Sequence, residues 1–150
     1  MVIGAELVFD DPGNLCFGCS PHNERGLQVR FTHVEPNAVE GRYTAAAHTC
    51  GAPGVIHGGV QAVLLDEAVG FAIRASDGGF DTDEVSEIAR VVTVEFALRY
   101  RRPALTGVEL LLRGEVLRTE GRDYYAEASI RDAEGQVLTE ATARWKRIDR

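Results

Sequence analysis

The chain has 150 residues, 45% of them hydrophobic and 26% charged, which is ordinary for a globular protein and sufficient to bury a sizeable core without disulfides. Its net charge of −7 argues against nucleic acid or an anionic membrane as the partner. No apolar run reaches the roughly 18 residues of a membrane span and the first residues lack the pattern of a secretion signal, so we expect a single cytoplasmic domain over residues 1–150.

Residues 1–26 show no periodic pattern and are expected to be irregular. Cys16 and Cys19 form a C-x-x-C pair here, with His22 close behind. A structural zinc site usually draws four ligands from two such pairs, and a thioredoxin-like motif would open a helix. We therefore favour two small thiols that shape a loop, with no metal bound, and zinc or redox chemistry is the alternative. The third cysteine, Cys50, makes the count odd, which argues against a disulfide framework.

A hairpin is predicted next. Apolar and polar residues alternate over 27–33 and again over 39–45, and the turn Glu35–Asn37 separates the two runs.

A helix is predicted over residues 58–75, directly after a glycine-rich stretch that ends in His57-Gly58-Gly59. It is apolar nearly all round, and a helix of this kind is usually buried. Asp66 and Glu67 nevertheless lie in its middle, and Glu67 shares a helix face with Arg74. A carboxylate in such a helix either faces an opening or serves a chemical purpose, so function is expected here.

An acidic loop, Phe80–Glu87, leads to four more alternating segments. The order of elements is therefore β-β-α-β-β-β-β, with one long helix for one sheet. A curved antiparallel sheet wrapped around a central helix covers every apolar face, so we predict an α+β protein of hotdog architecture. The residues expected to face the helix are Val92, Val94, Phe96, Leu98 and Tyr100, then Val108, Leu110, Leu112 and Val116, then Tyr124, Ala126, Ala128 and Ile130, and finally Val137, Thr139, Ala141, Ala143 and Trp145.

Three motifs occur in order along the chain. C-F-G-C-x-x-x-N-x-x-G-L spans Cys16–Leu27, and T-V-E-F-A-L-R-Y-R-R-P spans Thr93–Pro103. Between them, H-x-x-G-x-P-G-x-x-H-G-G is followed by an Asp nine residues after its last His, and it is carried by His48, Gly51, Pro53, Gly54, His57, Gly58, Gly59 and Asp66. Together the motifs closely resemble those of the PaaI-like branch of the hotdog acyl-CoA thioesterases.

The resemblance implies hydrolysis of an acyl-CoA thioester, with no cofactor beyond the coenzyme A of the substrate. It assigns the general base or nucleophile to Asp66, an oxyanion donor to the Gly58 backbone N–H, and a water-positioning hydroxyl to Thr93. One departure concerns Gly51, where several relatives carry an Asn or Gln that contacts the thioester carbonyl or water. That contact must be absent here or supplied by another group. The segment from Gly78 to Glu87 also looks longer than in relatives.

Apart from the resemblance, the residue types at the helix start and at Asp66 suit thioester hydrolysis. A helix N-terminus supplies unpaired N–H groups and a positive dipole end, and Gly58 and Gly59 let a carbonyl approach them closely. His57 is expected to cap the turn or orient the loop. Apolar neighbours raise the pKa of a carboxylate and would make Asp66 a better base. The alternative is that Asp66 or Glu67 merely faces solvent.

The spacing of the two proposed groups has a consequence for assembly. Gly58 and Asp66 are eight residues apart, so about 12 Å separates them along a helix axis. Attack on a thioester carbon needs contacts of roughly 3 Å. If both residues act on one carbon, they come from different chains, so we expect at least a homodimer and, beyond it, a dimer of dimers.

Substrate contacts are expected from Gly59, Val60 and Val63, in an apolar slot that Leu64 and Phe71 would complete. The identity of the acyl group stays open among aryl, medium-chain and branched groups.

Three residues after the helix are ambiguous. Simple alternation puts Thr93 on the face opposite Val92 and Val94, so a catalytic Thr93 requires a bulge or an interface position, and the alternative is an ordinary strand threonine. Arg101 and Arg102 are candidates to bind the phosphates of coenzyme A, or else they are solvated charges at the end of a strand.

Two other functions remain as alternatives. A hotdog hydratase or dehydratase would pair a histidine with a helix acid at another spacing, and the position fourteen residues after His48 is Ala62, not an acid. An acyl-CoA-binding module without activity would keep the fold and the slot but not the chemistry.

Overall fold

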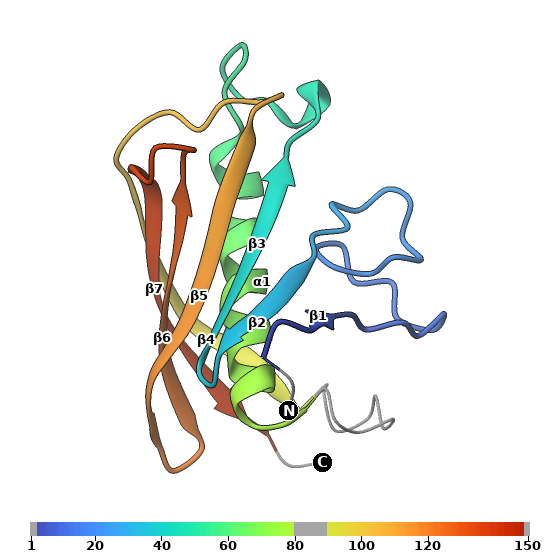
Figure 1. The fold of residues 1–150 in the computed structure, drawn as a ribbon, viewed down its shortest axis with the longest axis vertical. Helices are drawn as coiled ribbons and strands as arrows, with labels where there is room; N and C mark the ends of the chain where they lie inside the picture. The colour runs from blue at the N-terminus through green and yellow to red at the C-terminus, as the bar shows by residue number, and fades with distance from the viewer. Residues whose placement is uncertain (1–2, 80–89, 149–150) are drawn as a thin grey trace.

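A curved antiparallel sheet surrounds one long helix in the computed structural model, which describes residues 3–79 and 90–148 (Figure 1). The seven strands are ordered β1-β2-β3-β5-β6-β7-β4, so β4 forms one edge. The elements in chain order are β1 (Glu6–Leu7), β2 (Phe31–Glu35), β3 (Ala38–Thr44), the short 3₁₀ helix η1 (Ala47–Thr49), α1 (Gly58–Ser76), β4 (Val91–Tyr100), β5 (Glu109–Glu120), β6 (Asp123–Arg131) and β7 (Val137–Arg147).

This arrangement confirms the predicted α+β hotdog architecture. Helix α1 packs against each strand from β2 to β7, and the buried side chains of helix and sheet form one core. The predicted acidic loop Phe80–Glu87 lies outside the described residues. Within the described ranges, no helix combines the length and the apolarity that crossing a lipid bilayer requires.

The N-terminal part differs in two details from the prediction. The segment 1–26, predicted to be irregular, contributes the short strand β1, which pairs with β2. The strand predicted over 27–33 begins only at Phe31. The reason is that the N–H groups of Leu27 and Val29 donate to carbonyls of the N-terminal loop, which ties that loop to the chain just before β2.

Strand β5 approaches helix α1 so closely that the backbones of the two elements are in contact. A Cβ atom on Gly114 of β5 would lie 2.1 Å from the carbonyl oxygen of Ala68, so only glycine fits at this crossing. Burying each large apolar side chain contributes about 1.5–3 kcal/mol, and the helix residues exposed by 1% or less are Leu64, Leu65, Ala68, Val69, Phe71, Ala72 and Ile73.

Strand β4 departs from simple alternation because of a bulge. Thr93 pairs with Trp145 and Glu95 with Arg144, which leaves Val94 as an extra residue. The prediction that Val92 and Val94 face the helix is therefore wrong, and their exposed fractions are 38% and 43%. Beyond the bulge the predicted alternation resumes, with Phe96 and Leu98 packed against the core. Val108, also predicted to face inward, precedes β5 and is 43% exposed.

We predict that Gly114→Ala destabilises the fold by about 1–3 kcal/mol, because the new methyl group would overlap helix backbone that cannot move aside. Gly13→Ala is the matched control, since a Cβ there meets only ordinary van der Waals contacts with Asp11. Its free energy of unfolding should stay within about 0.5 kcal/mol of wild type. Denaturant titration of both variants measures the difference, and equal stability of the two would contradict the close crossing.

Candidate active site

His57 organises the start of helix α1. Its backbone N–H donates to the carbonyl of Thr49, which fixes the approach of the chain. Its ring Nδ1 accepts a hydrogen bond of 2.9 Å from the N–H of Gly59. The ring therefore caps the helix and uses the Gly59 N–H in doing so.

The N–H of Gly58 is the backbone donor left over at this end. No acceptor for it exists among the described residues, 3–79 and 90–148. It lies at the positive end of the α1 dipole, where a developing negative charge is stabilised. Of the two glycines expected to serve an anion, Gly58 is thus the one whose N–H is available.

Tyr100 holds Gly58 in place. Its hydroxyl donates a 2.7 Å hydrogen bond to the Gly58 carbonyl from the end of β4, and its ring lies against the glycine at the position of a Cβ atom. Sequence reasoning missed this residue, because alternation groups Tyr100 with the residues that face the core. The only indication of a functional role in the sequence was a tyrosine, with its polar hydroxyl, at the end of a predicted strand.

Asp66 is half-buried in the middle of α1, and Thr93 hydrogen-bonds to it. The Thr93 hydroxyl donates to Asp66 Oδ1 at 2.9 Å. The bulge at Val94 makes this contact possible, since it puts Thr93 on the helix side of β4. Burial raises the pKa of Asp66, while the Thr93 hydrogen bond and the charge of Arg74 partly offset the rise. A carboxylate with a raised pKa is a stronger base.

The residues predicted to bind the acyl group divide into two sets. Gly59, Val63 and Asp66 follow one side of the helix at spacings of four and three, and all three are exposed at least in part. Val60 is partly buried against the core. Leu64 and Phe71 do not belong to a slot, because both are fully enclosed in the core, with exposed fractions of 0% and 1%.

Glu67 does not face solvent, so that alternative is wrong for this residue. The N-terminal loop covers it, and Gly18 lies so close that a Cβ there would be 2.4 Å from Glu67 Cγ. The Cys16 thiol lies 3.4 Å from Glu67 Oε1. Burial, followed by the charge of Cys16, raises the pKa of Glu67 to about 8. Arg74 lies nearby, between the rings of Phe9 and Trp145.

The two arginines proposed for coenzyme A lie at the end of β4, where both backbone N–H groups donate to the carbonyl of Leu138. The Arg101 guanidinium pairs with Glu140 at 2.6 Å. A phosphate would have to compete with that carboxylate for Arg101. Arg102 is exposed beside it.

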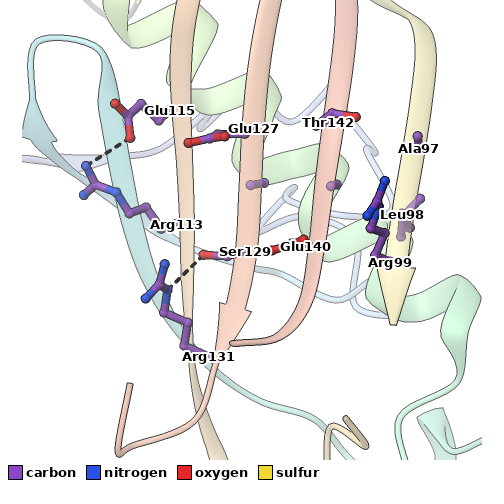
Figure 2. A pocket seen from close by; sticks show the side chains of 12 residues that line it. Ala97, Leu98, Arg99, Arg113, Glu115, Glu127, Ser129, Arg131, Glu140 and Thr142 are labelled. Atoms are coloured by element: carbon purple, nitrogen blue, oxygen red, sulfur yellow. Dashed lines mark hydrogen bonds and ion pairs between the residues drawn. The ribbon is translucent and has the colours of Figure 1, made fainter. Parts of the chain in front are cut away.

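A hollow of about 400 Å³ lies on the sheet face turned away from α1, between β4, β5, β6 and β7 (Figure 2). Among the side chains that line it, Arg113 pairs with Glu115 at 3.5 Å and Arg131 donates to the Ser129 hydroxyl. None of the residues predicted for catalysis or binding lines it. We therefore place the candidate active site on the helix side, at Gly58, Asp66 and Thr93.

Comparisons with known proteins identify the family and the fold of the chain. A family model described as the thioesterase superfamily matches residues 53–139, more than half of the chain. A crystal structure of a thioesterase superfamily protein is 28% identical with a TM-score of 0.74, and the match covers 88% of this chain but only 60% of that one. No curated protein matches significantly.

Two further structures bear on the fold alone. Zebrafish thioesterase superfamily member 2 is 22% identical with a TM-score of 0.70, and the match covers 87% of this chain and 88% of that chain. The E. coli PaaI protein, from the phenylacetic acid degradation operon, is 15% identical with a TM-score of 0.68, over 82% and 81% of the two chains. With the family match, they confirm the resemblance to PaaI-like hotdog thioesterases.

We predict that Thr93 and Asp66 are coupled by about 1 kcal/mol in the free energy of unfolding, the usual worth of such a hydrogen bond. A double-mutant cycle with Thr93→Val and Asp66→Ala measures this coupling. The control is Thr119→Val paired with Asp66→Ala, since Thr119 is an exposed strand threonine on β5. A coupling no larger than that of the control would contradict the contact.

Proposed function

The chain belongs to the thioesterase superfamily, and from this premise we propose that it hydrolyses an acyl-CoA thioester to a free acid and coenzyme A. The observation that carries the proposal is the pairing of two features of α1. One is the available N–H of Gly58 at the helix start, and the other is the half-buried Asp66 with its hydroxyl partner Thr93. The first suits a developing oxyanion, and the second suits activation of water.

In the proposed reaction, water held near Thr93 attacks the thioester carbonyl carbon while Asp66 takes a proton from it. The negative charge that develops on the carbonyl oxygen is stabilised by the Gly58 N–H and the helix dipole. The tetrahedral intermediate then expels the thiolate of coenzyme A, which receives the proton held by Asp66. Asp66 acting as nucleophile would give the same products through an anhydride that water hydrolyses.

The distance between the two groups supports a site shared by two chains. About 12 Å separates Gly58 and Asp66 along the helix axis, which is too far for one carbon to contact both. The edge strand β4 offers a place for a partner: it is ten residues long, and Val91 is its only buried residue. A long edge with unpaired backbone groups and exposed valines favours strand pairing with a second copy. We therefore propose a homodimer as the active form, and a pair of such dimers as the larger assembly.

The acyl group would lie beside Val60 and Val63, whose side chains are partly exposed. Of the two, Val63 shares the side of the helix that carries Asp66. Arg102 would be the first contact for the phosphates of coenzyme A, because Arg101 is already paired with Glu140. The PaaI relative comes from a phenylacetic acid operon, so an aryl-acetyl thioester belongs in a substrate panel together with medium-chain and branched acyl groups.

One observation favours a second candidate, an acyl-CoA-binding module without activity. Gly51, against the backbone of His57, offers no side chain where several relatives carry an amide that contacts the thioester or water. Binding without turnover would be the result if that contact were indispensable.

We predict that Asp66→Asn lowers kcat by about 10²–10⁴-fold, because general base catalysis is lost, with KM changed only a few-fold. Release of free thiol from an acyl-CoA panel measures the rates. Glu127→Gln, the same carboxylate-to-amide change on the outer sheet face, should leave them unchanged. Wild-type turnover no faster than that of Asp66→Ala, with every substrate, would instead support the binding module.

We further predict that two inactive variants restore activity when mixed. Gly58→Pro removes the N–H, and proline is well tolerated at the first position of a helix when the preceding residue, here His57, has an extended backbone. A Cβ at position 58 would lie 3.3 Å from the Tyr100 hydroxyl, so Tyr100 has to shift by a few tenths of an ångström. Random exchange with Asp66→Asn leaves half of the dimers hybrid, each with one intact site, so roughly a quarter of wild-type activity should return. No recovery, with subunit exchange confirmed by mass spectrometry, would rule out the shared site.

A further inference from the structure

A second group of reactive side chains lies beside the candidate active site and plays no part in the proposed hydrolysis. Cys16 and Cys19 come from the N-terminal loop, and Glu67 comes from helix α1. One ligand atom from each, two sulfurs and a carboxylate oxygen, lie within 4.8 Å of one another. His22 is not a member, because its ring pairs with Asp10 at 2.7 Å.

The loop holds the two thiols in position before any ligand arrives. The Ser20 N–H donates to the Cys16 carbonyl, which closes a turn and brings the two cysteines to the same side. The Cys16 N–H donates to the side chain of Asn14. At Gly18 the loop backbone rests on Glu67 itself. The three ligands are therefore fixed relative to one another by several independent contacts.

The distance between the Cys16 sulfur and the Glu67 carboxylate suits a tetrahedral zinc site. Zinc binds thiolate sulfur at about 2.3 Å and carboxylate oxygen at about 2.0–2.2 Å, so neighbouring ligand atoms lie about 3.5–3.8 Å apart. The Cys16 sulfur is 3.4 Å from Glu67 Oε1, close to that edge length. The C-x-x-C spacing is also the one that zinc sites commonly use.

The local charge favours a divalent cation. Zinc ligands have to be deprotonated, and with both thiols and the Glu67 carboxyl deprotonated the set would carry three negative charges, of which the nearby Arg74 guanidinium offsets one. Zinc would neutralise the remaining two. Because sulfur ligands prefer zinc to calcium or magnesium, the donor set also selects the metal.

We propose that Cys16, Cys19 and Glu67 bind one zinc ion per chain. With three protein ligands the fourth coordination position is open to water, and the half-buried Cys16 leaves that side accessible. The site would tie the N-terminal loop to α1 next to Asp66. It does not depend on the proposed hydrolysis, since binding involves none of the residues assigned to catalysis.

Cobalt serves as the probe, because Co²⁺ replaces zinc and reports its ligands by colour. Full-length protein is reduced, freed of metal with a chelator and titrated with Co²⁺ under nitrogen. We expect the sulfur-to-cobalt charge-transfer band and the intense visible bands of tetrahedral cobalt, saturating at one ion per chain and abolished by zinc. Cys16→Ser and Cys19→Ser should each lose the charge-transfer intensity, and Glu67→Gln should weaken binding at least about tenfold.

Cys50→Ser is the matched control, since Cys50 is exposed and lies outside the group, and it should bind cobalt like wild type. Circular dichroism of the metal-free proteins verifies that each variant is folded. Fully reduced wild type without the charge-transfer band would overturn the proposal. A Cys16–Cys19 disulfide found by mass spectrometry, with no metal uptake after its reduction, would also overturn it and assign the pair to redox chemistry.

Discussion

Helix α1 has to be enclosed, because it carries apolar side chains around most of its circumference. A single sheet can enclose a helix only by curving around it and approaching it closely. Gly114 marks the closest approach, where strand backbone meets the carbonyl of Ala68. The glycine in β5 follows from this constraint. So does the narrow strip of helix surface that escapes burial.

That strip is where the chemistry lies. Asp66 and Glu67 are neighbours in the sequence, but about 100° of helix rotation separates them, so they meet different surroundings. Asp66 faces β4 and the Thr93 hydroxyl. Glu67 faces the N-terminal loop and the Cys16 thiol. One helix thereby presents two carboxylates to two separate sets of partners, and burial raises the pKa of both.

The architecture was predictable from the sequence because it rests on period-two alternation and on a single long apolar helix. Asp66 and Gly58 could be named because their spacing is local. Other parts depend on contacts between distant segments: Glu67 meets Cys16 from 51 positions away, and Tyr100 reaches Gly58 from 42 positions away. The bulge was predictable only indirectly, because a catalytic Thr93 would require it. Val94 is an ordinary strand residue, and its type gives no indication of a bulge.

The bulge in β4 divides one strand into two parts of opposite phase. Ahead of Val94, odd-numbered residues face the helix, and after it even-numbered residues do. The part that holds Thr93 is thereby uncoupled from the part whose Phe96 and Leu98 complete the core. Side chains around Asp66 can therefore diverge among related proteins without repacking the interior, which gives the fold a way to vary its chemistry while keeping its stability.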